Sequence, residues 1–142
     1  HQEDGASNYS GYPRMTICNN YFYNVLTRAP GLMRYGYFHS YNNFVYDFNL
    51  GYTPYTGCNI YSEKNYFDKG SHKGAVVDDK GVGGFTDSGS TLSSSVSSLK
   101  TGATSWRPSG NYGYATRSAS DARAWCQKYS GAQSSAIVYA ID

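Results

Sequence analysis

Three segments decide the fold: MTICNNYF at residues 15–22, FHSYNNFV at residues 38–45 and IYSEKNYF at residues 60–67. They align without gaps, and their first residues are 23 and 22 positions apart (15, 38 and 60). A repeat of this length is typical of solenoids, in which each unit is too small to bury its own apolar face and stacks on its neighbours. The sequence therefore predicts a stack of similar coils over about residues 14–85.

The pattern inside each segment predicts strands whose alternate side chains point into the stack. Met15, Phe38 and Ile60 occupy one register, and the residue two positions later is expected to point the same way. That second residue is Ile17 in the first segment and a serine in the other two. We therefore expect large and small side chains to share the interior.

An asparagine recurs at the same place in all three segments. Asn20, Asn43 and Asn65 precede the aromatic residue of each segment, where a turn is needed. Stacked asparagines can hydrogen-bond through their amides along a column, and asparagine also tolerates the left-handed backbone of a sharp turn. The sequence thus predicts an asparagine ladder along one turn of an all-β parallel solenoid.

The rest of the chain is less regular. Ala75, the glycine-rich turn at residues 81–84 and Phe85 predict a fourth coil, and residues 86–117 are loop-rich, with many Ser, Thr and Gly. A short helix over about residues 119–129 has Ser118 or Ser120 as candidate N-cap and Gly131 just beyond its end. All 142 residues fit one domain.

Composition excludes several classes of protein. Aromatic residues make up 17% of the chain, with 16 Tyr and 16 Gly, which favours strands and turns over disorder. The formal net charge of +2 and the scattered basic residues predict neither a nucleic-acid-binding nor a membrane-binding surface. Three cysteines allow at most one internal disulfide and suit neither a disulfide scaffold nor a zinc site. The start shows no signal peptide, so we expect a chain that is already trimmed or begins within a longer protein.

Residues 17–44, ICNNYFYNVLTRAPGLMRYGYFHSYNNF, resemble the segment HHNYFxNVxxRAPRVRFGxVHVYNNYY of the pectate lyases of polysaccharide lyase family one. Residues 61–67 are similar to the ENNYFE segment of that family, and residues 106–132 to its C-terminal cap. The resemblance implies the C-terminal half of a right-handed, single-stranded parallel β-helix. It also implies cleavage of polygalacturonate by β-elimination.

Three site residues follow from the resemblance. Arg28, in the RAP motif, matches the arginine that the family uses as Brønsted base, and Arg34 matches an arginine that binds the substrate carboxylate. The spacing between the two is six residues instead of the usual five, and the family's middle arginine is replaced by Gly31 or Leu32. His39 lies in a strand position that alternates with the interior, and is either structural or a substrate-binding residue of the groove.

The resemblance implies calcium as cofactor, with its ligands on coils that precede residue 1, so no metal ligand is assigned in this chain. It implies polygalacturonate or pectin as partner, and secretion from the cell. Because a solenoid cut between coils exposes its cross-section, we also expect a partner that covers residues 1–25, most simply the protein's own N-terminal half.

Other functions remain open. One is a non-catalytic β-helix that binds pectin or is allergen-like, and another is a calcium-independent pectin lyase, although Arg34 favours an acidic substrate. Residues 114–142 also resemble part of some ADP-ribosyltransferases, but the glutamate motif that should follow is absent.

Overall fold

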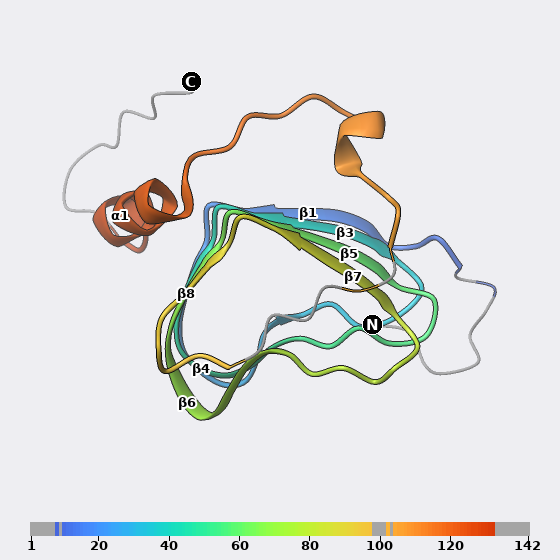
Figure 1. The fold of residues 1–142 in the computed structure, drawn as a ribbon. Coiled ribbons are helices and arrows are strands. Elements are labelled where there is room, and N and C mark those ends of the chain that lie inside the picture. The colour runs from blue at the N-terminus through green and yellow to red at the C-terminus, as the bar shows by residue number, and fades with distance from the viewer. Residues whose placement is uncertain (1–7, 9, 98–101, 103, 133–142) are drawn as a thin grey trace.

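Two parallel sheets form the body of the molecule. The computed structural model describes residues 8, 10–97, 102 and 104–132. The first sheet contains, in spatial order, β1 (Arg14–Cys18), β3 (Tyr37–Tyr41), β5 (Asn59–Glu63) and β7 (Gly84–Ser88). The second contains β2 (Tyr21–Gly31), β4 (Phe44–Tyr52), β6 (Tyr66–Val77) and β8 (Thr91–Leu92). The chain visits each sheet once per coil, so the predicted β-solenoid is confirmed (Figure 1).

The first sheet stacks the residues that share a register in the repeat. Met15 pairs with Phe38, Phe38 with Ile60, and Ile60 with Phe85. Phe38, Ile60 and Phe85 are 4%, 0% and 3% exposed, so the predicted inward-facing column is present. Burial of such large apolar side chains is the main favourable term in folding. Met15, at the outer end of the column, is 45% exposed.

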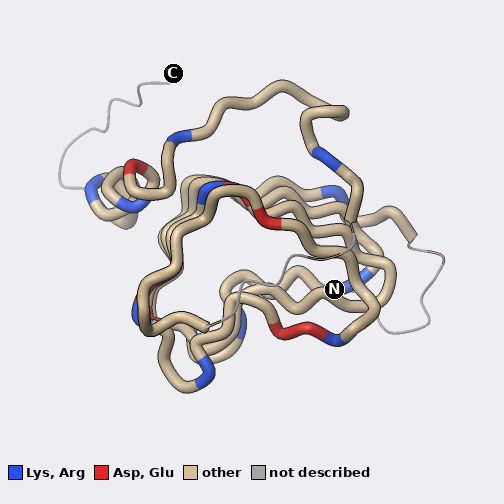
Figure 2. The backbone as a smooth tube through the Cα atoms, viewed as in Figure 1, with Lys and Arg blue, Asp and Glu red and all other residues tan. Residues whose placement is uncertain are grey.

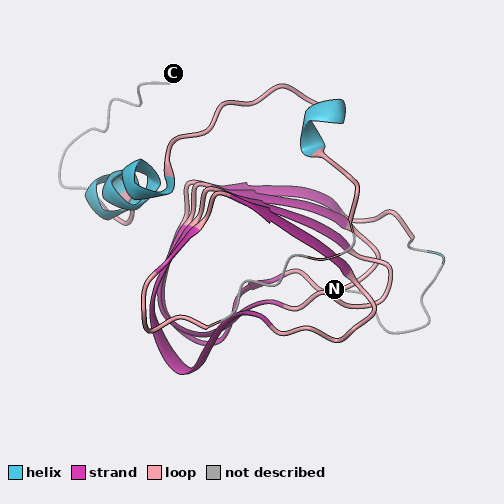
Figure 3. Cartoon of the chain, in the orientation of Figure 1, coloured by secondary structure: helices cyan, strands magenta, loops and turns pink. Residues whose placement is uncertain are grey.

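The asparagine ladder runs along the turn between the two sheets. The side-chain amide of Asn20 donates to Oδ1 of Asn43 (3.1 Å), and that of Asn43 donates to Oδ1 of Asn65 (3.0 Å). The backbone N–H groups of Asn20 and Asn43 donate to the same two oxygens. Each turn needs a left-handed residue just before the ladder, and the φ angles of Asn19, Asn42 and Lys64 are 57°, 51° and 47°. The predicted ladder is confirmed, and the stacked turns are visible in Figure 3.

A polar group lies at the centre of the core. The side chain of Tyr52, in the second sheet, is 1% exposed, and its hydroxyl donates to Oγ of Ser40 (2.8 Å). Oγ of Ser62 lies 3.3 Å from the same hydroxyl. A buried hydroxyl is costly unless it is hydrogen-bonded, so the serines of the interior column provide both room and partners for this tyrosine.

Regular stacking continues beyond residue 85. β7 runs to Ser88, and Ser90 replaces the next asparagine of the ladder, because its Oγ accepts from the backbone N–H of Asn65 (3.0 Å). Asp87 accepts from the Ser90 hydroxyl (2.6 Å), and burial raises the pKa of this carboxyl. Ser97 still forms a parallel bridge with Ala75. Part of the predicted loop-rich region is therefore a fourth, shorter coil.

The C-terminal segment crosses the outer face of the first sheet and ends in helix α1 (Ala119–Tyr129), at the corner between the sheets (Figures 1 and 3). A 3-10 turn (Pro108–Gly110) precedes this crossing. Of the two candidate N-caps, Ser118 is the one that accepts from the backbone N–H of Asp121 (3.1 Å). Sγ of Cys126 packs against the ladder turns, 3.5 Å from the carbonyl oxygen of Asn20.

Charged residues are dispersed along the backbone, and neither sign gathers in one block (Figure 2). Within the described ranges, no helix combines the length and apolar character needed to cross a membrane. All three cysteines are free thiols; Cys58 and Cys126 are buried, and Cys18 is half-buried. Burial raises the pKa of the Cys58 thiol to about 11.

Candidate active site

Arg28 lies in the second half of β2, paired with Leu50 of β4. Its Nε donates to Oγ1 of Thr53, at 3.0 Å. Thr53 is fully buried, whereas Arg28 is exposed. Gly31 lies close to this side chain: a Cβ at Gly31 would lie 3.5 Å from Cβ of Arg28, and its φ of +89° favours glycine. Arg28 is thus anchored at Nε on the next coil and accessible from outside.

Arg34 follows on the same coil and is half-buried. Its guanidinium carbon lies 4.5 Å from the centre of the Tyr55 ring. The backbone around the two residues is paired, because the N–H of Tyr55 donates to the carbonyl of Met33 (2.9 Å) and the N–H of Tyr35 donates to that of Thr56 (2.9 Å). The position of Arg34 is therefore fixed by its neighbouring coil.

The two arginines line one cavity of about 380 Å³. Its walls come from the second half of β2, the segment that joins β2 to β3, the residue before β1 and the outer end of the core column. The complete lining is Pro13, Met15, Thr27, Arg28, Pro30, Gly31, Leu32, Met33, Arg34 and Phe38. The only charged side chains in this set are the two arginines, so the cavity favours an anionic ligand. Its size lies within the range of small-molecule sites, about 300–1,000 Å³.

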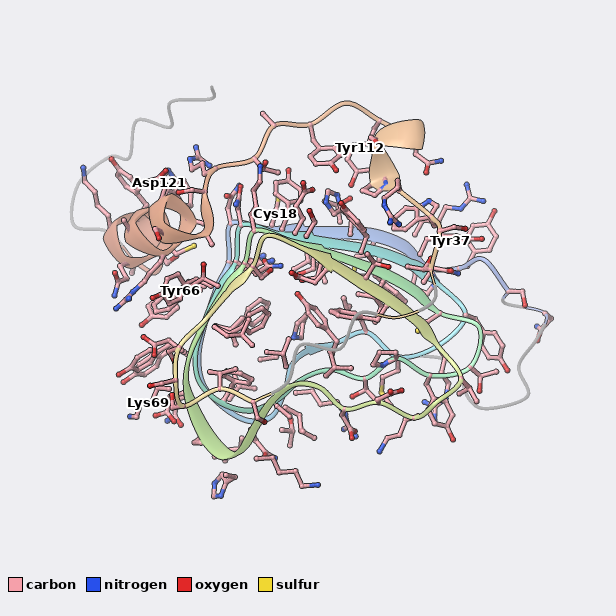
Figure 4. All side chains as sticks on the ribbon, in the orientation of Figure 1. Cys18, Tyr37, Tyr66, Lys69, Tyr112 and Asp121 are labelled. Atoms are coloured by element: carbon pink, nitrogen blue, oxygen red, sulfur yellow. The ribbon has the colours of Figure 1, made fainter. Side chains whose placement is uncertain are left out.

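His39 lies elsewhere. Its side chain is 1% exposed and contacts Tyr112 of the C-terminal segment, which Figure 4 shows outside the first sheet. Nδ1 lies 2.6 Å from the hydroxyl of Tyr112, and Nε2 lies 3.4 Å from Oε2 of Glu63. Tyr114 donates to the same carboxylate (2.9 Å). Burial lowers the pKa of His39, against the opposing effect of Glu63. Of its two predicted roles, this geometry favours the structural one.

The described residues do not fit a calcium site. Within this part of the chain, no group of three or more His, Cys, Asp or Glu side chains is placed to hold a metal ion. Asp78 and Asp79, which are adjacent, are used in a turn: Asp78 pairs with Lys80 (3.0 Å), and Asp79 accepts from the backbone N–H of Gly81 (2.7 Å). The calcium ligands that the family resemblance implies were expected on coils that precede residue 1.

Thr53 and Tyr55 were not predicted from the sequence. Each contacts one of the two arginines from the next coil. The repeat length of 22 to 23 residues, applied to Arg28 and Arg34, points to residues 50–51 and 56–57, which lie on either side of Thr53 and Tyr55, so the repeat did not identify these two residues.

A family model described as pectate lyase matches residues 1–135. The chain belongs to the pectate lyase family. A pectin lyase from Bacillus subtilis is 48% identical over 139 residues, and one from Pectobacterium carotovorum is 46% identical over 138 residues. Each alignment covers 96% of this chain. Pectate lyase A from Aspergillus niger is 36% identical over 67 residues, 47% of this chain and 20% of that protein.

The fold of this pectate lyase family member matches a solved relative. The crystal structure of a pectate lyase from Bacillus sp. N165 in complex with trigalacturonate aligns with a TM-score of 0.71 and 26% identity, over 84% of this chain and 40% of that one. The chain spans 39% and 43% of the lengths of the two bacterial pectin lyases. The family assignment thus rests on sequence and fold together.

Proposed function

We propose that the protein cleaves polygalacturonate by β-elimination, with Arg28 as base and Arg34 as carboxylate-binding residue. The observation that supports this most directly is that both arginines line one cavity with no acidic residue in its lining. The family match and the trigalacturonate bound by the Bacillus sp. N165 pectate lyase agree with an anionic galacturonate substrate.

In this reaction Arg28 removes the proton on C5, which is α to the carboxylate. The electron pair forms a double bond between C4 and C5, the C4–O bond to the neighbouring sugar breaks, and the leaving oxygen takes a proton from solvent. The arginine side chain can accept this proton only in its neutral guanidine form, which is a strong base but is rare near pH 7.

Three further parts belong to this proposal. Calcium, held by carboxylates of other coils, would neutralise charge on the substrate carboxylate. The protein acts outside the cell, because a polymeric substrate does not cross a membrane. The exposed end of the stack, where Met15 is 45% and Leu26 is 73% exposed, packs against the protein's own N-terminal coils.

A second candidate is pectin lyase activity, on methyl-esterified polymer and without calcium. The observation that favours it is that the bacterial relatives at 44–48% identity are named pectin lyases. Methyl esterification removes the negative charge of the carboxylate that Arg34 would bind. The cationic cavity would therefore contribute to binding of polygalacturonate but not of the methylated polymer.

The test is an absorbance assay for the unsaturated product, with the protein expressed from its complete reading frame. Polygalacturonate and highly methylated pectin are compared, each with and without a calcium chelator. We expect faster cleavage of polygalacturonate and loss of activity on chelation. Preference for methylated pectin that survives chelation would establish the second candidate. Binding of either polymer without product would show a non-catalytic pectin-binding protein.

A further inference from the structure

One short segment of the next coil provides a side chain that contacts Arg28 and another that contacts Arg34. Thr53 accepts from Nε of Arg28, and Tyr55 lies under the guanidinium of Arg34. The two residues are separated by a single proline, Pro54. We call residues 53–55 the arginine support.

The backbone fixes this support in register with the arginines. The N–H of Thr53 donates to the carbonyl of Gly31 (2.7 Å), and the N–H of Tyr55 donates to that of Met33 (2.9 Å). Bonds repeated at every second residue are the pattern of a parallel pair, in which side chains two apart point the same way. A displacement of the support would therefore move both arginines together.

The two contacts constrain different features of the arginines. A hydrogen bond at Nε fixes the plane of the Arg28 guanidinium, and Thr53 is 0% exposed, so water does not compete for its oxygen. The guanidinium carbon of Arg34 lies over the Tyr55 ring, 4.5 Å from its centre, so the ring holds the cation by a cation–π contact, whereas a carboxylate is bound by the guanidinium N–H groups.

From this geometry we propose that Thr53 and Tyr55 are positioning residues of the lyase site, Thr53 for the base and Tyr55 for the carboxylate-binding arginine. The inference rests on the proposed function. The two roles predict different kinetic effects. A base acts in the transition state, so loss of its support should lower kcat, whereas a carboxylate-binding residue holds substrate and transition state alike, so loss of its support should raise KM.

The experiment compares matched pairs of variants on polygalacturonate, in the protein expressed from its complete reading frame. Thr53→Val keeps the shape but removes the acceptor, and we expect kcat to fall about tenfold, as for loss of one hydrogen bond, with KM within about twofold. Thr53→Ser keeps a hydroxyl and should restore kcat. Tyr55→Leu should raise KM about fivefold at similar kcat, and Tyr55→Phe, which keeps the ring, should not.

Two kinetic outcomes would overturn the inference. One is equal kcat for Thr53→Val and Thr53→Ser; the other is parallel change of kcat and KM in Tyr55→Leu, which simple destabilisation would produce. Arg28→Lys separates this from the proposed function: if it keeps wild-type turnover, the base assignment itself fails.

Nitrogen-15 NMR tests the geometry without an activity assay. The Nε–H of Arg28 should exchange slowly with water in the wild-type protein and in Thr53→Ser, and rapidly in Thr53→Val. Rapid exchange in all three would also overturn the inference.

Discussion

At the scale of single residues, Asn43 carries more of the fold than its size suggests. It is 1% exposed and bonds to the ladder residue on each side, to Oγ of Ser40 and to the backbone carbonyl of Ile17. Each contact satisfies a group that lies away from water, so the loss of this one side chain leaves several groups without partners.

We therefore expect Asn43→Ala to lower the free energy of unfolding by about 3 kcal/mol or more, as for two or three unsatisfied buried groups. Urea unfolding followed by circular dichroism measures the change. Asn49→Ala is the control, because Asn49, also on the stack, is only half-buried and its side-chain hydrogen bonds are long, at 3.3 Å. Equal effects of the two substitutions would show that the ladder adds no special stability.

Arg28 supplies the catalytic prediction at this scale. Arg28→Lys should lower turnover of polygalacturonate at least about a hundredfold, the range for loss of a proton-transfer group, while substrate binding stays within about tenfold. Lysine keeps the charge but does not reproduce the Nε contact with Thr53. Initial rates from product absorbance and affinity from calorimetry separate the two effects. A large loss of affinity with unchanged turnover would assign Arg28 to binding.

The sequence alone identified the two arginines of the site but not the side chains that contact them. Arg28 and Arg34 were identified by their motif, and the structure brings both to one cavity. Thr53 lies 25 residues after Arg28 and three residues beyond Leu50, which is the register partner of Arg28, in a stretch where the pairing of β2 with β4 shifts on both sides of Arg28. Such bulges re-aim side chains locally and leave no periodic trace in the sequence.

At the scale of elements, the C-terminal segment is held to the first sheet by a buried cluster around His39. The ring centre of His39 lies 4.6 Å from that of Tyr41 and 4.5 Å from that of Tyr114, and Glu63 and Tyr112 bond to its nitrogens. The groups that face this imidazole are thus one carboxylate and several phenols, with Tyr61 also in ring contact. The cluster connects a segment of poor sequence periodicity to the regular stack.

This cluster should make stability depend on pH. Burial lowers the pKa of His39 in the folded protein, so below the ordinary histidine value of about 6.5 the unfolded chain binds more protons. We therefore expect stability to be constant above about pH 7 and to fall as the pH drops below about 6.5. Thermal unfolding at several pH values measures this.

Two variants identify the group responsible. His39→Gln should flatten the pH dependence between pH 7 and 5, which is the range below the ordinary histidine pKa of about 6.5. His72→Gln is the matched control, because His72 is exposed on β6, and it should keep the wild-type slope. An unchanged slope in His39→Gln would assign the effect to other groups.

Sequence periodicity predicted the strands most accurately in the coils whose residues repeat. The register of Met15, Phe38 and Ile60 was predicted and is present, because each column position has an unambiguous apolar residue. The last coil was harder to detect: Ser90 performs the ladder role of an asparagine with a hydroxyl, which no search for asparagine would find. The role of Tyr112 and Tyr114 over His39 depends on a crossing between distant segments that leaves no local pattern.

At the scale of the whole molecule, the two ends of the stack differ. Large apolar side chains of the first coil are exposed, namely Met15 at 45%, Tyr23 at 61% and Leu26 at 73%, whereas Phe85, at the other end of the column of Met15, is 3% exposed. Among the described strands, β1 is an edge strand that pairs only with β3. Edge strands with exposed apolar neighbours promote association.

Residues 1–142 expressed alone should therefore self-associate or bind added N-terminal coils, and sedimentation velocity measures this. Met15→Glu and Leu26→Glu are expected to weaken the association, and Val82→Glu, at a position that is 58% exposed on another part of the surface, is the control. A monodisperse, stable monomer of wild-type residues 1–142 would contradict the proposed covering of this end.

The asparagine ladder also makes the length of this architecture adjustable. Asn43 and Asn65 are 22 residues apart and bond identically to the coil before them. An in-frame duplication of residues 43–64 would place a new asparagine between two existing ones, with every amide partner restored. An insertion of another length would leave donors without acceptors. Gene duplication of one coil is thus a route by which such a protein can lengthen its stack of strands without redesigning its core.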